Sequence, residues 1–422
     1  MTSTVDTLRF TTAGSVDDGK STLIGRLLYD SKSIFEDQLA SVESASNKRG
    51  GNRVDLSLLT DGLTAEREQG ITIDVAYRYF TSAKRRFIIA DTPGHEQYTR
   101  NMVTGASTAD LTVILVDAAK GLQTQSRRHA IIASLLGIPH VVLAVNKMDA
   151  VGYSQSVFED IRSEFTHFCR DLAFAELDFI PVSALEGDMV VERGDKLGWY
   201  AGPTLLELLE TTRAAEASAR EFRFPVQRVA QTRFGNALDT RGYMGRIESG
   251  RVSVGDSIAV LPSGLTARVK DIVTLDGSLA TASAPKSVTL LLDTQLDISR
   301  GDLIAHADEL PTVSNQITAN LAWMSAQPLD ASRRYLIKHT TQTVRAAIEG
   351  IDYRLDVNTL ARETGVTTFK LNDIGRLRLK TLKPLITDGY RANRATGSFI
   401  LIDEVTNQTV AAGMISNEAA HG

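Results

Sequence analysis

The sequence predicts an α/β domain with a mainly parallel sheet and helices on both faces, followed by two all-β barrel domains. Up to about residue 220, apolar runs of strand length alternate with segments of helical spacing, which is typical of a parallel sheet covered on both sides. A glycine-rich loop separates the first strand from the first helix. Beyond residue 220 the strand-like runs are short and punctuated by glycine, which predicts barrels or sandwiches.

Length and composition narrow the class of protein. A chain of 422 residues is long for one core, and we place domains at 1–220, 221–313 and 314–422. The net charge of −5 argues against a dedicated nucleic-acid binder, so no nucleic-acid partner is expected. The single cysteine, Cys169, lies among apolar residues of an expected helix, so we interpret it as a core residue in a reducing compartment. The sequence has no signal-peptide pattern and no apolar run long enough to cross a bilayer, so we expect a cytoplasmic protein without a membrane partner.

The elements of the first domain follow in order. A strand over 8–13 leads through the glycine-rich loop into a helix with apolar residues at 23, 24, 27 and 28. The polar stretch 31–70 comes next, and a connection this long is more often functional or mobile than structural. Runs at 74–80 and 86–90 predict two strands that pair as a hairpin. Further strands are expected at 111–117, 141–145 and 179–182, and further helices at about 123–136, 154–174 and 203–217.

Each β unit contains five runs that predict strands. In the first unit they lie at 224–229, 242–249, 255–261, 266–272 and 287–292. In the second they lie at 317–324, 335–339, 341–348, 376–382 and 398–403. The two units show no convincing internal repeat.

The first loop carries the phosphate-binding pattern G-x-x-x-x-G-K-[ST] between a strand and a helix, as the pattern requires. Its residues are Gly14, Ser15, Val16, Asp17, Asp18, Gly19, Lys20, Ser21 and Thr22. Glycines let the backbone wrap a phosphate, Lys20 can reach the outer phosphates, and Ser21 can place its hydroxyl on Mg²⁺. The helix N-terminus adds partial positive charge. This loop alone predicts a nucleotide phosphate and neither a base nor a reaction.

A second motif, D-x-x-G, ends the run 86–90 and consists of Asp91, Thr92, Pro93 and Gly94. An acidic residue at the carboxyl end of a buried strand lies at the edge where open α/β sheets bind ligands. Alone, Asp91 would more simply be a turn or capping residue. After a phosphate loop, however, D-x-x-G is the magnesium-side element of a GTPase.

A third motif, N-K-x-D, follows another strand and predicts guanine as the base. It consists of Asn146, Lys147, Met148 and Asp149. The Asp149 carboxylate can accept hydrogen bonds from guanine N1–H and the exocyclic amine, whereas adenine would leave it unpaired. Asn146 and Lys147 would brace the loop and cover the base, and Ser183, Ala184 and Leu185 would complete the pocket with backbone N–H groups. The order and spacing of the three motifs predict GTP and GDP as ligands, with Mg²⁺.

Hydrolysis needs a water positioned in line with the γ-phosphate. His95, directly after D-x-x-G, is the candidate that orients this water, and the alternative is an ordinary surface histidine. Thr72 is the candidate second magnesium ligand, together with Ser21 and Asp91. Val16 and Ile71 are candidates for an apolar gate in front of His95, and Asp17 for holding a monovalent cation beside the phosphates.

The motifs in this order, with Gly70-Ile71-Thr72-Ile73 before D-x-x-G, resemble translational GTPases of the elongation-factor-Tu type over essentially the whole chain. Within that superfamily, the loop Gly-Ser-Val-Asp-Asp-Gly-Lys-Ser differs from the factors' Gly-His-Val-Asp-His-Gly-Lys. This loop and the runs at 61–80, 87–102, 297–302 and 396–403 resemble the family of large, GTPase subunits of bacterial sulfate adenylyltransferase. The resemblance implies a P-loop GTPase domain followed by two β-barrels.

The resemblance also implies a partner, a small catalytic subunit that joins sulfate to ATP, giving adenosine 5′-phosphosulfate and pyrophosphate, while the large subunit hydrolyses GTP. The alternative is a translation factor that delivers aminoacyl-tRNA. Asp18 argues against the alternative because it places negative charge where the factors have a histidine, and the net acidic composition agrees.

Overall fold

The computed structural model describes residues 6–34, 42, 56–59, 72, 74–214, 220–234 and 237–416, without the side chains of 96, 232–234 and 237–240. The chain divides into two compact units, Met1–Ala215 with Val357–Leu360, and Glu216–Asp356 with Ala361–Gly422. Most of the polar stretch expected at 31–70 lies outside the described residues, as does Ile71 of the expected gate. Within the described part of the chain, no helix is both long and apolar enough to span a membrane.

The first unit is built on a six-stranded sheet of order β2-β3-β1-β4-β5-β6. Its strands are β1 (Thr7–Gly14), β2 (Ala76–Thr81), β3 (Arg86–Asp91), β4 (Leu111–Asp117), β5 (His140–Asn146) and β6 (Glu176–Pro181). Only β2 runs antiparallel, and it pairs with β3 as the expected hairpin. The expected, mainly parallel sheet is therefore confirmed. Its inner strands β4 and β5 are buried along their whole length.

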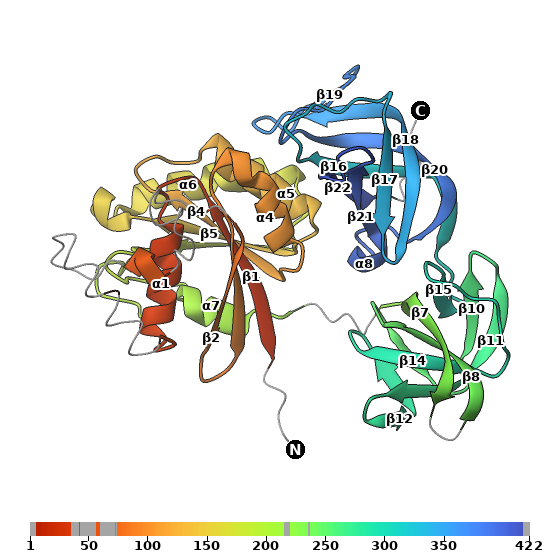
Figure 1. The fold of residues 1–422 in the computed structure, drawn as a ribbon. Helices are drawn as coiled ribbons and strands as arrows, with labels where there is room; N and C mark the ends of the chain where they lie inside the picture. Colours follow the sequence, from red (N-terminus) through yellow and green to blue (C-terminus); the bar gives the residue numbers. More distant parts are fainter. Residues whose placement is uncertain are drawn as a thin grey trace. The chain divides into compact units, whose positions relative to one another are not determined.

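Helices follow β1, β3, β4, β5 and β6 along the chain, whereas β2 and β3 are joined by a turn. In Figure 1, α1 and α4 flank β1 on opposite sides. The α-helices described in this unit are α1 (Lys20–Asp30), α4 (Thr99–Ala106), α5 (Thr124–Leu135), α6 (Gln155–Phe168) and α7 (Leu205–Thr211). Two are shorter than expected. The helix expected at 154–174 ends at Phe168 and continues only as a short 3-10 turn, Cys169–Asp171. The helix expected at 203–217 begins at Leu205, because Thr204 and Glu207 form a capping box that sets its first turn.

The second unit contains two closed antiparallel barrels. In the first barrel, strands β10-β15-β7-β8-β14-β11 close through a β10–β11 pairing, with β12 attached to β11 and a separate β9–β13 ribbon. Its strands are β7 (Arg223–Phe234), β8 (Ala237–Arg246), β9 (Arg251–Ser253), β10 (Ser257–Leu261), β11 (Leu265–Thr274), β12 (Gly277–Leu279), β13 (Thr281–Ser283), β14 (Ser287–Leu292) and β15 (Leu303–His306). The expected all-β unit is therefore a barrel rather than a sandwich, with four short strands that the five expected runs omit.

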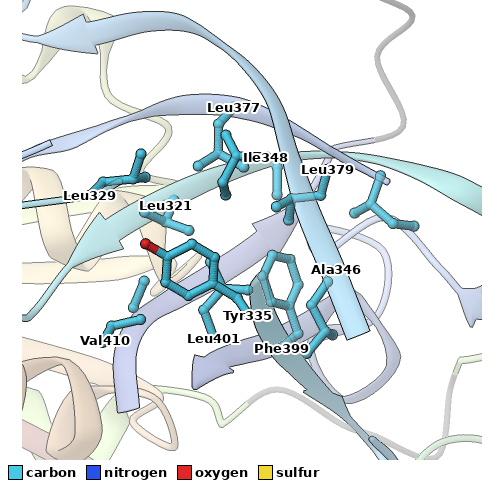
Figure 2. Close-up of a cluster of buried hydrophobic side chains, with 14 of the residues drawn as sticks. Leu321, Leu329, Tyr335, Ala346, Ile348, Leu377, Leu379, Phe399, Leu401 and Val410 are labelled. Atoms are coloured by element: carbon cyan, nitrogen blue, oxygen red, sulfur yellow. The ribbon is translucent and has the colours of Figure 1, made fainter. Parts of the chain in front are cut away.

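The second barrel closes in the same manner, with order β17-β21-β22-β16-β20-β18, a β17–β18 pairing and β19 attached to β18. Its strands are β16 (Thr312–Trp323), β17 (Arg334–His339), β18 (Gln342–Leu355), β19 (Arg362–Glu363), β20 (Ile374–Thr387), β21 (Ser398–Asp403) and β22 (Thr409–Ile415), with the short helix α8 (Arg394–Gly397). Figure 2 shows its core, in which Tyr335, Phe399 and Leu401 pack against side chains of the neighbouring strands.

The two barrels are joined by a buried polar network and a small apolar cluster. Arg223 of β7 is almost wholly buried and donates two hydrogen bonds, at 2.9 and 3.0 Å, to the carboxylate of Asp388, which follows β20. Asn393 donates to Ser249 Oγ at 2.7 Å. The cluster consists of Leu261, Leu303, Ala305 and Ile386. Such a contact holds the barrels together only while the buried charges stay paired.

Candidate nucleotide-binding site

The phosphate loop lies between the end of β1 and the start of α1, as expected. The Lys20 ammonium donates hydrogen bonds to the carbonyl oxygens of Gly14 and Ser15, both at 2.9 Å. This side chain is buried, and burial lowers the pKa of Lys20, while the carboxylates of Asp91 and Asp18 oppose that shift. The Lys20 side chain therefore lies across the loop, and its ammonium group is enclosed by the loop backbone. From this position an ammonium can reach a bound phosphate.

The backbone of the loop needs residues that tolerate unusual conformations. Gly19 has a φ of 91°, and a Cβ placed there would lie 2.4 Å from Asn146 Nδ2. Asp17 also has a positive φ, 67°. A non-glycine residue in this region stores strain, which persists only where the surroundings hold it.

Asp18 is the unusual member of the loop. Its carboxylate is buried and accepts a hydrogen bond from the Ser15 backbone N–H through Oδ2, at 2.6 Å. The other oxygen, Oδ1, has no hydrogen-bond partner among the described residues. Burial raises the pKa of Asp18, although the hydrogen bond from Ser15 and the charge of Lys20 act in the other direction. The Asp18 side chain therefore bonds back to the start of the loop and holds its two ends together.

The D-x-x-G motif lies against the phosphate loop. Asp91 ends β3 beside Thr12 of β1, and the Thr12 hydroxyl donates to Asp91 Oδ1 at 3.5 Å. Gly94 lies so close that a Cβ there would be 2.3 Å from Lys20 Nζ and 2.4 Å from the Gly14 carbonyl oxygen. Any larger residue at position 94 would therefore displace the lysine or the loop.

The candidate magnesium ligands fit that ion by their chemistry. Ser21 and Asp91 offer hard oxygen donors, which Mg²⁺ prefers. Ser21 is half-buried at the start of α1, and Asp91 is buried. Thr72 is half-buried, but its chain neighbours at 71 and 73 lie outside the described residues, and among those described it makes no hydrogen bond to the loop. Its role as a ligand stays a prediction.

His95 follows Gly94 at the start of the turn Glu96–Tyr98. Its ring is half-buried and meets the ring of Tyr98 edge-on, with centroids 6.0 Å apart. Its Nδ1 accepts a long hydrogen bond, 3.5 Å, from the Gln97 backbone N–H. The structure thus places His95 next to the D-x-x-G motif, and its action on a water stays a prediction.

Asn146 joins the base side of the site to the phosphate side. Its Nδ2 donates to the Asp18 carbonyl oxygen at 2.7 Å, and its Oδ1 accepts the Ala184 backbone N–H at 3.0 Å. Both bonds are buried. Three segments that are separate in the sequence therefore meet at one side chain, at the carboxyl ends of β1, β5 and β6, as expected for an open α/β sheet.

The rest of the base pocket is arranged around the same loop. Asp149 Oδ1 accepts the Ser183 hydroxyl at 2.6 Å, which orients the carboxylate predicted to read guanine. Lys147 has a φ of 60° and donates to Asp117 Oδ2 at 2.9 Å. Met148 is buried beneath the loop. Leu185 is exposed, and its carbonyl oxygen accepts a hydrogen bond from Arg26 of α1 at 2.6 Å.

Sequence reasoning missed Asp117, the last residue of β4. Burial would raise the pKa of Asp117, but the hydrogen bonds from Lys147 and from the Ala119 N–H outweigh it, and that pKa is lowered. An anionic Asp117 can therefore hold the Lys147 ammonium beside the predicted base pocket. The signal was available, since an acidic residue ends this strand as Asp91 ends β3.

Sequence reasoning also missed the residues that hold the end of the base loop. The Tyr153 hydroxyl donates to Asp188 Oδ2 at 2.7 Å and accepts from Lys196 Nζ at 3.2 Å. The Trp199 indole N–H donates to the Tyr153 carbonyl oxygen at 3.0 Å. These contacts tie the loop after N-K-x-D to the segment after Leu185.

Two further residues of this unit are buried and titratable. His129 of α5 is buried near Lys20, and burial together with the charge of Lys20 lowers its pKa to about 3, so the imidazole is neutral at pH 7. Cys169 is buried, as expected for a core residue, and burial raises its thiol pKa to about 12.

Comparison with known proteins gives matches along nearly the whole chain. Residues 6–215 match the family model of the elongation factor Tu GTP binding domain, and residues 316–416 match that of the GTP-eEF1A C-terminal domain-like family. The chain is 52% identical to sulfate adenylyltransferase subunit 1 of Francisella tularensis, over 97% of this chain and 86% of that protein. It is 54% identical to the protein of that name in Teredinibacter turnerae, over 96% of this chain and 86% of the relative.

A bifunctional relative and a solved structure complete the comparison. The bifunctional enzyme CysN/CysC of Mycobacterium tuberculosis is 55% identical over 98% of this chain, which spans 68% of that protein. The GTPase-like domain of S. cerevisiae Ski7, bound to GDP and inorganic phosphate, aligns over 98% of each chain with a TM-score of 0.55 and 18% identity. At that identity the likeness concerns the fold alone.

Proposed function

The chain belongs to the sulfate adenylyltransferase subunit 1 family, within the elongation-factor-Tu-like GTPases, and from this premise we propose that its GTP hydrolysis drives formation of adenosine 5′-phosphosulfate by a partner subunit. The protein is an enzyme of sulfate activation with a GTPase domain. The proposal adds three things to this statement: the identity of the partner as the small catalytic subunit, the coupling, and the roles of individual residues.

The observation that carries the proposal is that the phosphate loop, the N-K-x-D motif and the Ser183–Leu185 segment meet at Asn146. Its side chain bonds both to the phosphate loop, at Asp18, and to the Ser183–Leu185 segment, at Ala184. A site in which phosphate and base loops share one buried side chain supports binding of a complete guanine nucleotide rather than of a phosphate alone. The names of the relatives then supply the reaction class.

In the proposed site, Lys20 and the backbone N–H groups at the start of α1 bind the phosphates. Ser21 and Asp91 hold Mg²⁺, with Thr72 added when the segment before β2 closes over the γ-phosphate. The bound ion neutralises charge on the phosphate oxygens. Asp149, oriented by Ser183, accepts the hydrogen bonds of guanine.

Hydrolysis is assigned to the residues that follow β3. His95 orients the attacking water in line with the γ-phosphate, while Val16 and Ile71 form the apolar gate in front of it. Val16 is exposed at the loop, and Ile71 lies outside the described residues. Asp17, at its positive φ, holds a monovalent cation beside the phosphates.

The coupling follows from the chemistry of the product. A sulfate–phosphate anhydride is unfavourable to form, so its accumulation needs an input of free energy. GTP hydrolysis in one subunit can supply it only if both subunits share a conformational cycle, in which each nucleotide state favours a different state of the other active site. The adenylyl transfer itself is assigned to the partner, since the motifs of this chain provide one nucleotide site, for GTP.

The test uses the purified chain with and without the second subunit of the same enzyme. We expect GTP hydrolysis to rise, and pyrophosphate to be released, only when the second subunit, ATP and sulfate are all present. Each is omitted in turn as a control. His95→Ala should abolish the stimulated hydrolysis while GDP still binds.

Two results would overturn the proposal. Hydrolysis that responds to ribosomes, and not to sulfate with ATP, would indicate a translation factor. Pyrophosphate release at the same rate and extent with GDP in place of GTP would show that hydrolysis does not drive the reaction.

A further inference from the structure

The open face of the sheet at its β2 edge carries a hollow that the nucleotide site does not use. A cavity of about 260 Å³ opens there. Ile88 and Ala90 of β3 line it from the sheet, and Gly105 of α4 with Thr108 and Ala109 lines it from the helix side. The lining residues on the helix side are small.

Strand register explains which residues surround the hollow. Tyr79 of β2 pairs with Ile88 of β3, and Ile88 pairs with Arg9 of β1. Side chains directly opposite one another lie on the same face of a sheet. Tyr79, Ile88 and Arg9 therefore form one row across three strands, and Tyr77 lies two residues from Tyr79 on the same face.

A second row continues this face away from the hollow. Arg86 of β3 pairs with Thr81 of β2 and with Thr7 of β1. We call the surface formed by Arg9, Tyr77, Tyr79, Arg86 and Ile88 the β2 face. In Figure 1 its outer strands β1 and β2 can be followed in the first unit; β3 lies between them and pairs with both.

The tyrosines of the β2 face are unusually exposed for large aromatic side chains. Tyr79 is 68% exposed and Tyr77 is 45% exposed, both on the edge strand of the sheet. Exposed aromatic groups around an apolar hollow mark interaction sites, because removing apolar surface from water lowers the free energy. Tyrosine and arginine are also the residues that contribute most often to the binding energy of interfaces.

The arginines of the β2 face carry uncompensated charge. Arg9 and Arg86 are exposed, and no carboxylate among the described residues lies at ion-pair distance from either guanidinium. The nearby acids are engaged elsewhere: Asp110 accepts the backbone N–H of Arg9 at 3.1 Å, and Asp6 pairs with Arg85. The face therefore presents two positive charges: Arg9 lines the apolar hollow, and Arg86 lies farther along the same face.

We propose that the β2 face is the docking surface for the catalytic subunit, which places an apolar or aromatic side chain in the hollow and carboxylates against Arg9 and Arg86. The inference rests on the proposed function for the existence of that subunit. Carboxylate–guanidinium pairs are strong and directional, so they would fix the orientation of the partner while the hollow supplies the buried anchor.

A second copy of this chain is a poorer occupant. A two-fold dimer through this face would bring the same surface of each copy together, and so place arginine against arginine. The position in the chain also favours the catalytic subunit. β2 begins at Ala76, shortly after Thr72, and α4 begins at Thr99, shortly after His95. A partner on this face would contact β2, into which the segment that is proposed to close over the γ-phosphate leads.

The experiment measures the affinity of the GTP-loaded chain for the separately purified second subunit by calorimetry. Tyr79→Glu should weaken binding at least about 30-fold, as for loss of a central interface residue, and Arg9→Glu by about 10-fold or more. Tyr79→Phe should bind like the wild type, because the ring is kept. Leu382→Glu is the matched control, since Leu382 is exposed to a similar extent, 72%, on β20 of the second barrel, and should change binding less than about 3-fold.

GDP affinity and basal GTP hydrolysis should be unchanged in all four variants, because none of these side chains belongs to the nucleotide site. If Tyr79→Glu loses GDP as well, Tyr79→Ser takes its place and is judged by the same criterion. The docking proposal is overturned if Tyr79→Glu and Arg9→Glu bind the second subunit with wild-type affinity. The proposed function still stands in that case, provided that the wild-type protein and the second subunit together release pyrophosphate. A wild-type chain that does not bind the second subunit overturns both.

Discussion

Asn146 is the side chain on which the assembly of the nucleotide site depends, so Asn146→Ala is the sharpest test of that assembly. Replacement by alanine removes the bond to the Asp18 carbonyl oxygen, 2.7 Å, and the bond from the Ala184 N–H, 3.0 Å. Both partners stay buried, and a buried group left without its hydrogen bond costs about 1–3 kcal/mol. Two such groups cost about 2–6 kcal/mol in total.

This cost falls partly on folding and partly on nucleotide binding. The phosphate and base loops would separate in the free protein and would have to be brought together by the nucleotide. If half of a total of about 4 kcal/mol appears in binding, GDP affinity falls roughly 30-fold. The assay is calorimetry or fluorescent-GDP displacement, with urea unfolding measured in parallel for the folding share.

Asn393→Ala is the matched control for this variant. Asn393 is also buried, and it donates to Ser249 and caps α8 in the second unit. It should lower the free energy of unfolding of that unit by a similar amount and leave GDP affinity unchanged. GDP affinity within 3-fold of the wild type in Asn146→Ala would refute the reasoning, because the two loops would then be held by other contacts.

Four further changes test other parts of the structure. Asp149→Asn should shift base preference from guanine toward xanthine, measured as the ratio of GDP to XDP affinities; an unchanged ratio would contradict the pocket assignment. His129 is held neutral by a pKa of about 3, so the unfolded state binds its proton first and stability falls as pH drops below about 6.5. Between pH 7 and pH 5 this effect should lower the free energy of unfolding of the first unit by about 2 kcal/mol, and His129→Gln should not show this part of the loss. A pH profile identical to that of the wild type would contradict this. Arg223→Met leaves the buried Asp388 carboxylate without its cationic partner, with only the Thr396 hydroxyl donating to it. The variant should destabilise the second unit by about 3–5 kcal/mol, most of which the double variant with Asp388→Leu recovers. No recovery would mean that the loss comes from packing rather than from the buried charge. Because phosphate should further raise the already raised pKa of Asp18, the proton uptake that accompanies GDP binding should increase as the buffer pH is lowered, measured by calorimetry in buffers of different ionisation enthalpy. Asp18→Asn should reduce this uptake, and an unchanged uptake in the variant would contradict the assignment.

Much of the first unit could be predicted because its signals are local. Two apolar runs separated by a short polar turn predict the hairpin of β2 and β3. The positions of Gly14, Asp91 and Asn146 follow from their place at the ends of strands. In a parallel sheet those ends share one edge, so motifs found separately in the sequence are expected to meet. The register and the bonds of Asn146 agree with this expectation.

The contacts that escaped prediction join residues with no local pattern. Asp117 and Lys147 are separated by a helix and a strand, and the bond between Tyr153 and Asp188 crosses a similar distance in the sequence. Short strands of the first barrel such as β9 and β13 have three residues each, too few for a two-residue period to be recognised. The start of α7 was predictable, since Thr204 and Glu207 have capping-box spacing.

The placement of Asp18 shows how a carboxylate can be tolerated in a loop that binds anions. Oδ2 of Asp18 accepts the Ser15 backbone N–H, which holds the carboxylate inside the loop, and burial raises the pKa of Asp18. The elongation factors, which this loop resembles, have histidine at that place. A histidine could accept the same N–H only through an unprotonated ring nitrogen, and as an imidazolium it would donate instead. The change from histidine to Asp18 therefore alters how the loop is held closed rather than which phosphate it receives.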